Sequence, residues 1–190
     1  MKRTLRIMLA IATASPLAAL AQEDVSQNRQ KFVSPDGRFG IHQSKEEDVD
    51  GIVMTRVDLV EVKSGTKLCE LGTLGNPWAA DIRILWSPDS RRLAFVSPSR
   101  RGDWTDVWVL KDKSFEQVAL PEMPSLDMKR DHYAKTVLAS YSALRWTKPD
   151  VLLLKYSAED DEGNSAQMQF AWHFDANNRA SVSQVGGKRR

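Results

Sequence analysis

A short pattern recurs three times along this chain and constrains its fold more than any other feature. The first copy reads Phe32-Val-Ser-Pro-Asp-Gly-Arg-Phe39, and the second reads Leu85-Trp-Ser-Pro-Asp-Ser-Arg-Arg-Leu-Ala-Phe-Val-Ser97. A weaker third copy, Leu144-Arg-Trp-Thr-Lys-Pro-Asp-Val-Leu-Leu-Leu154, carries a threonine in place of the serine and an additional lysine before Pro-Asp. Self-similarity at intervals of tens of residues is typical of folds built from stacked supersecondary units.

Each copy predicts a tight antiparallel hairpin, because proline presets φ at the first turn position and Asp followed by Gly or Ser suits the next. A polar loop, a third apolar strand, a second turn and a fourth strand then follow. The loops are 45–51, 98–105 and 158–165, the third strands 52–62, 106–110 and 167–174, and the fourth strands 67–71, 115–120 and 180–185. We therefore predict an all-β protein with three consecutive four-stranded antiparallel units, at about 32–72, 81–120 and 139–185.

Three of these strands, 81–86, 106–110 and 151–156, carry apolar side chains on both faces. A strand with one hydrated face should alternate between apolar and polar residues. Two apolar faces indicate sheets sandwiched between other sheets, as in the stacked blades of a β-propeller.

The second copy, Trp86 to Ser97, with the Gly-Asp loop and Asp106-Val-Trp-Val-Leu110 that follow it, resembles a blade of the TolB-type β-propeller repeat. The likeness is good over 81–120, partial over 32–72 and poor over 139–185. Members of that family are mostly periplasmic interaction modules or the propeller parts of larger enzymes. The resemblance therefore implies a propeller-like fold and a binding role, and implies no particular reaction.

Three units do not complete a ring, since propellers typically have four to eight blades. We expect either a partial propeller, with the segment 121–141 covering an edge, or a ring of six blades closed by dimerisation, because open sheet edges tend to be paired or covered. Within that segment, the helix-like spacing of Met128, His132, Lys135 and Leu138 is compatible with a short helix over 126–138. A β-sandwich remains the alternative fold.

The first 21 residues have the pattern of a cleaved signal peptide: Lys2, Arg3 and Arg6, an apolar run over 7–14, and small residues at Ala19 and Ala21. We expect export to the periplasm or the medium, and a single domain over 22–190 without a transmembrane segment. The leader holds three basic residues and no acidic one, so 24 basic and 25 acidic residues remain after it. That balance does not favour nucleic-acid binding.

The sequence shows no pattern of catalytic residues. It lacks a Gly-x-Ser-x-Gly elbow and a phosphate-binding glycine loop, and His42, His132 and His173 fall in different units without metal-ligand spacing. Cys69 alternates with apolar residues as in a strand, which indicates a small buried side chain. We predict no catalytic residues, no metal and no cofactor.

One contact patch stands out in the second unit. Arg100, Arg101 and Trp104 cluster in its polar loop, and Arg and Trp are enriched where proteins contact one another. We therefore predict a protein-binding or scaffold module that is not an enzyme, with a protein partner and the option of a homodimer. Two alternatives stay open: an accessory or inhibitory subunit of an exported hydrolase or peptidase, and an enzyme with a site in an oligomeric propeller channel.

Overall fold

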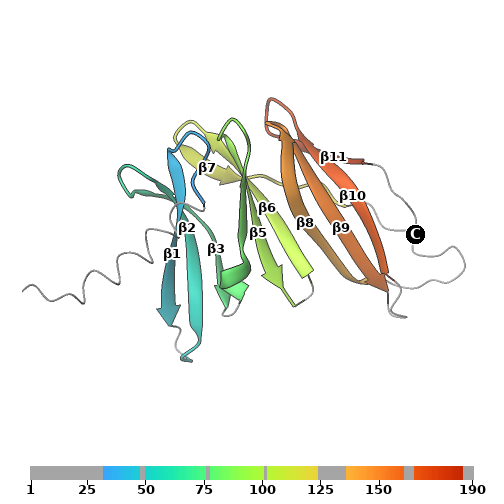
Figure 1. Cartoon of the computed structure of the whole chain (residues 1–190), viewed down its shortest axis with the longest axis horizontal. Helices are drawn as coiled ribbons and strands as arrows, with labels where there is room; N and C mark the ends of the chain where they lie inside the picture. Colours follow the sequence, from blue (N-terminus) through green and yellow to red (C-terminus); the bar gives the residue numbers. More distant parts are fainter. Residues whose placement is uncertain are drawn as a thin grey trace, which may run out of the picture.

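The computed structural model describes residues 32–47, 50–75, 78–100, 102–123, 136–160 and 165–185, and within them it consists of three antiparallel β-sheets (Figure 1). The first sheet contains β1 (Phe39–Glu47), β2 (Val53–Glu61) and β3 (Lys67–Gly75), and a short 3-10 helix, η1 (Trp78–Asp81), follows it. The second contains β4 (Arg83–Trp86), β5 (Arg92–Ser99), β6 (Gly102–Lys111) and β7 (Ser114–Gln117). The third contains β8 (Thr136–Lys148), β9 (Val151–Asp160), β10 (Ser165–Phe174) and β11 (Ala180–Gln184).

The all-β class and the succession of three antiparallel units are confirmed, and in each sheet the strands are neighbours in chain order. The sheets stand side by side in an open row in Figure 1, and the described residues form neither a closed barrel nor a closed propeller. The only helix among these residues is η1, and none of them belongs to a helix that is long and apolar enough to cross a membrane.

Three details differ from the prediction. The first sheet has three described strands and not four, because Phe32 lies in a turn and the residues before it are outside the described part. The loop expected at 98–105 is mostly strand, since β5 and β6 pair as far as Ser99 and Gly102. Of the helix expected at 126–138, residues 136–138 belong to β8, where pairing with β9 replaces helical bonds, and 126–135 lie outside the described residues.

The Ser-Pro-Asp turns of the first two units have the same hydrogen bonds. In the second unit the Ser87 hydroxyl donates to Asp89 Oδ1 at 2.6 Å and accepts from the Arg92 N–H at 2.9 Å. In the first unit Ser34 bonds Asp36 Oδ1 at 2.6 Å and the Phe39 N–H at 3.0 Å in the same way. The serine side chain thus ties the turn to the start of the following strand, which explains why this residue type recurs.

The middle sheet is buried on both faces, as the two apolar faces of its strands predicted. Leu93 and Phe95 of β5 pack towards the first sheet, and the residues between and after them, Ala94 and Val96, pack towards the third. The first core also contains Phe39, Ile41, Val57, Leu59, Leu71 and Phe115, and the second contains Val107, Val109, Leu152, Leu154, Phe170, Trp172 and Phe174. Two apolar layers therefore hold the three sheets together.

A tryptophan hydrogen bond repeats at both sheet interfaces. The indole N–H of Trp86 donates to the carbonyl of Phe32 at 3.1 Å, and that of Trp146 donates to the carbonyl of Leu85 at 2.8 Å. Phe32 and Leu85 hold the same place in their repeat copies, one residue before the position of the tryptophan. Each later unit is therefore attached to the one before it by the same polar contact.

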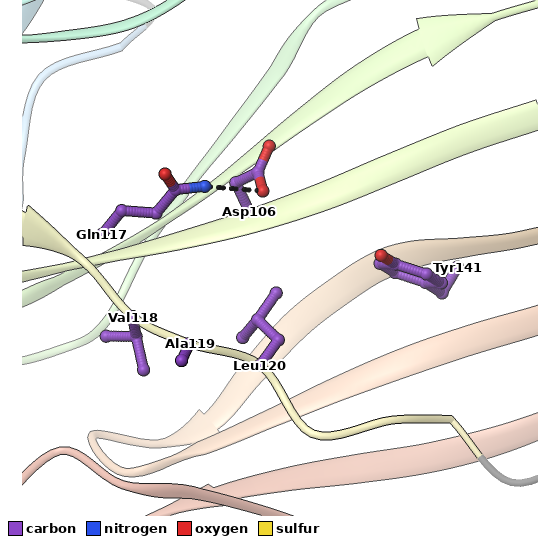
Figure 2. Close-up of a pocket in the computed structure, with 6 residues that line it drawn as sticks. All are labelled: Asp106, Gln117, Val118, Ala119, Leu120 and Tyr141. Carbon is purple, nitrogen blue, oxygen red and sulfur yellow. Dashed lines mark hydrogen bonds between the residues drawn. The ribbon is translucent and has the colours of Figure 1, made fainter.

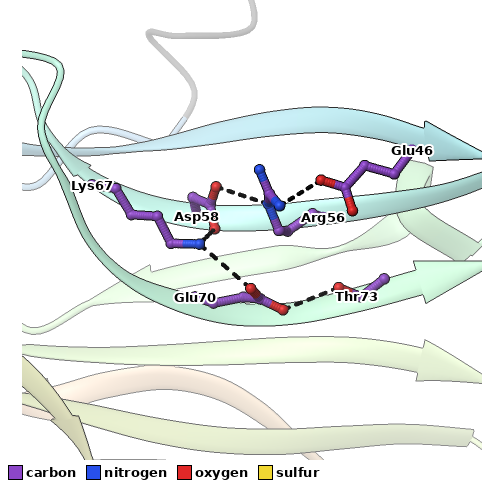
Figure 3. A network of polar contacts seen from close by, with 6 residues as sticks. All are labelled: Glu46, Arg56, Asp58, Lys67, Glu70 and Thr73. Atoms are coloured by element: carbon purple, nitrogen blue, oxygen red, sulfur yellow. Dashed lines mark hydrogen bonds and ion pairs between the residues drawn. The ribbon is translucent and has the colours of Figure 1, made fainter.

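The outward face of the first sheet is polar. Asp58 of β2, whose side chain is 5% exposed, lies between Arg56 Nε at 3.2 Å and Lys67 Nζ at 2.7 Å (Figure 3). The chain of contacts continues from Arg56 to Glu46, from Lys67 to Glu70 at 3.4 Å, and from the Thr73 hydroxyl to Glu70 at 3.1 Å. In the second and third sheets, the equivalent face is the one that packs on the preceding sheet. There it is apolar and belongs to one of the two cores.

Candidate functional site

The junction between the second and third sheets carries two of the three side chains that the sequence singled out, Arg100 and Trp104. The turn between β5 and β6 approaches β8 so closely that a Cβ on Gly102 would lie 2.5 Å from Ser140 Cβ. Gly102 also has a φ of +108°, a region that only glycine adopts readily. The absence of a side chain at this position allows the turn to rest against the third sheet.

Polar side chains fasten β6 to the edge of β8. The buried Thr105 hydroxyl donates to the Tyr141 carbonyl at 3.0 Å and accepts from the Ala143 N–H at 2.9 Å. The Ser142 hydroxyl donates to Asp103 Oδ2 at 2.7 Å, and Arg83 forms an ion pair with the same oxygen at 3.2 Å. The two strands are therefore held in a fixed relation at this junction.

An aromatic row crosses the junction. The Trp104 ring packs edge-on against Tyr141 with centroids 5.1 Å apart, and Tyr141 packs in the same manner on the buried Trp172 at 5.6 Å. Trp104 is 39% exposed and is the only large aromatic side chain among the exposed hydrophobic residues of the described part. The row gives an exposed indole a rigid support.

A hollow of about 360 Å³ opens beside this row. It is lined by Asp106, Gln117, Tyr141 and the chain that leaves β7, residues Val118, Ala119 and Leu120 (Figure 2). The Gln117 amide donates to Asp106 Oδ1 at 2.9 Å. Burial raises the pKa of Asp106, opposed by the bond from Gln117, and burial together with the charge of Asp106 raises the pKa of Tyr141.

A second hollow of about 400 Å³ also lies along β8. Its lining residues are mostly polar: Arg100, Ser140, Ser157, Ala158, Glu159, Ser165, Ala166 and Gln167. Ser140 and Tyr141 are consecutive in β8, and each lines one of the two hollows. We call Trp104, Tyr141 and the two hollows the junction site.

Two of the three residues of the predicted patch belong to the junction site. Arg100 lines the second hollow. Trp104 is the exposed aromatic residue of the junction site, and it lies within β6 and not in a loop. Arg101 lies outside the described residues. Sequence reasoning missed Asp106 and Tyr141, and a charge in an otherwise apolar strand was the one signal that could have pointed to Asp106.

The remaining candidates for chemistry lie apart. His42 is an exposed residue of β1, His173 of β10 bonds the Ser183 hydroxyl at 2.8 Å, and His132 lies outside the described residues. The described part of the chain contains no group of three His, Cys, Asp or Glu side chains arranged to hold a metal ion. Cys69 is half-buried against the first core, and burial and the charge of Asp58 raise its pKa to about 11.

Comparison with known proteins adds no relative: no family model, no curated protein and no solved structure matches this chain. The junction site must therefore be interpreted from its own chemistry. It combines an exposed indole, an arginine and a half-buried carboxylate, which are groups suited to binding another molecule.

Proposed function

We propose that this chain is an exported protein-binding module built from three TolB-like blades, with no catalytic chemistry of its own. The observation that carries the proposal is the junction site, where the exposed Trp104 packs on Tyr141, which lines the hollow that contains Asp106. Arg100 lines the second hollow, to which the neighbouring Ser140 of the same strand contributes. Trp, Tyr and Arg dominate the energetics of protein interfaces, and here all three occur together.

The rigidity of the site supports this proposal. Trp104 and Tyr141 stand on strands that Thr105 and Ser142 tie together, with the buried Trp172 behind them. A side chain that is already ordered loses little conformational entropy when a partner packs on it. Function at a rigid surface of a repeat fold is also how stacked units commonly bind their partners.

Two sequence features support the location and the class of partner in this proposal. The leader pattern over 1–21 supports export to the periplasm or the medium. The near balance of acidic and basic residues after that leader supports a protein partner over a nucleic acid, whose phosphates need an excess of positive charge.

The test is a quantitative capture experiment with the purified, immobilised protein and a periplasmic extract of the source cell. We expect a partner that the wild-type protein retains and that Trp104→Ala loses by at least about tenfold, since interface tryptophans commonly contribute 2 kcal/mol or more. Val62→Ala is the matched control, because Val62 is also exposed (48%) but lies just beyond β2, in the first sheet. Equal retention by both variants would contradict a role for the junction site.

A further inference from the structure

We propose that the hollow at Asp106 receives the side chain of a lysine or arginine from the bound protein. This inference rests on the proposed protein-binding function and specifies the partner's chemistry at one position. It predicts that the recognised segment carries a cationic residue next to the group that packs on Trp104.

The charge of the hollow favours a cation. Of the described residues that line it, Asp106 is the only charged one. Its carboxylate accepts a hydrogen bond from Gln117, and no lysine or arginine in the described part of the chain forms an ion pair with it. A half-buried carboxylate without a counter-ion attracts a positive group more strongly than a hydrated surface carboxylate does.

The walls of the hollow suit the rest of such a side chain. Val118 and Leu120 offer apolar surface to an aliphatic stem, and the Tyr141 ring offers an aromatic face or edge beside the carboxylate (Figure 2). Lysine and arginine combine an apolar stem with a cationic head, and both bind well where hydrocarbon, aromatic ring and carboxylate lie together. A hollow of about 360 Å³ is large enough for one such side chain.

A metal ion fits this hollow less well. Asp106 supplies the single carboxylate, and the described residues contain no cluster of three metal-ligating side chains anywhere. Hard cations such as Ca²⁺ take six to eight oxygen ligands, which this lining does not offer. The raised pKa of Asp106 is consistent with a carboxylate that still lacks a cationic partner.

The test is an NMR titration of the purified protein with N-acetyl-arginine methylamide, N-acetyl-lysine methylamide and the neutral isostere N-acetyl-citrulline methylamide. We expect the arginine or lysine probe to shift the Gln117 side-chain amide and the backbone amides of 118–120 and 141, with a dissociation constant of about 1–10 mM. We expect the citrulline probe to leave these signals in place. This comparison needs no substitution, so it does not depend on the folding of a variant.

Asp106→Asn removes the charge and keeps an oxygen that can accept the bond from Gln117, and we expect it to weaken binding of the cationic probe at least tenfold. Glu116→Gln is the matched control, because Glu116 lies on β7 beside Gln117, is exposed, and pairs with Lys111 outside the hollow. Equal shifts with citrulline, equal binding by Asp106→Asn, or no binding of either cationic probe would each overturn the inference. The proposed function would still stand if capture remained dependent on Trp104.

Discussion

At the scale of the residue, Cys69 shows how a local environment decides whether a thiol is reactive. Burial, and secondarily the negative charge of Asp58, raise its pKa to about 11 from an ordinary value of 9.0, while Lys67 acts in the opposite direction. The thiolate is the reactive form, so the native thiol should be inert at neutral pH. We expect the rate of alkylation by iodoacetamide to rise with a midpoint near pH 11 in the native protein and near pH 9 in urea.

The same shift gives a pH dependence of stability with a definite sign. Folding favours the neutral thiol, and the resulting contribution to the free energy of unfolding is complete below pH 9. It is lost as the pH rises from 9 towards 11, because over that range the unfolded chain releases the thiol proton and the folded chain retains it. Asp58→Asn should lower the alkylation midpoint, because it removes one of the two causes. A native midpoint equal to that in urea would show that folding leaves the thiol pKa unchanged, and a lower one would identify Cys69 as an activated thiol.

At the scale of the element, the two equivalent tryptophan bonds predict equivalent energetic roles. Trp86→Phe and Trp146→Phe each keep an aromatic ring and remove the N–H that reaches the preceding unit. Each should lower the free energy of unfolding by about 1–2 kcal/mol, the cost of losing a partly buried hydrogen bond and some ring area. Because the bonds lie at different interfaces, the double variant should show additive losses in urea unfolding. A coupling above about 1 kcal/mol would show that the two interfaces do not act independently.

The β5–β6 turn offers a second comparison between elements. Gly102→Ala combines a φ of +108° with a Cβ placed 2.5 Å from Ser140, so it should cost about 2–4 kcal/mol and displace Trp104 from Tyr141. Gly65→Ala has a similar backbone constraint, with a φ of +71°, but its Cβ would meet no atom within 4 Å. It should therefore cost only about 1 kcal/mol. Urea unfolding measures the two losses of stability, and the NMR signal of the Trp104 indole N–H, assigned by substitution, reports its displacement from Tyr141. Equal losses of stability would contradict the close packing of the turn on β8.

The same elements show which features a sequence can predict. The strands and turns follow from local signals, because alternation sets the faces of β5 and β6, and Ser34 and Ser87 sit in the turns that they close. The strand at Gly102 was missed because its polar residues resemble a loop, and pairing with β5 overrides that local preference. The hollow at Asp106 depends on where β7 ends and on how β8, from another unit, approaches it. The sequence around Asp106 indicates neither the end of β7 nor the approach of β8.

At the scale of the whole molecule, the two outward faces differ from the faces that pack inside. The outward face of the first sheet carries the ion pairs around Asp58, and that of the third carries exposed Lys155, Gln167, Gln169 and His173. The equivalent positions within the stack are apolar, such as Ala94, Val96, Val107 and Val109 of the middle sheet. Terminal units of repeat proteins commonly have polar outer faces of this kind, which limit further stacking.

These polar faces predict that the protein is a monomer in solution, although three units also allow a ring of six blades made from two copies. Closing such a ring would bury the ion pairs around Asp58 against polar residues of a second copy, and burying charges without new partners is unfavourable. Light scattering across a sizing column, at protein concentrations from micromolar upwards, should therefore give the mass of one chain. A dimer would show that the polar faces do pair. Arg56→Ala and Lys67→Ala, which remove the two cations that contact Asp58, would then weaken it if those faces form the interface.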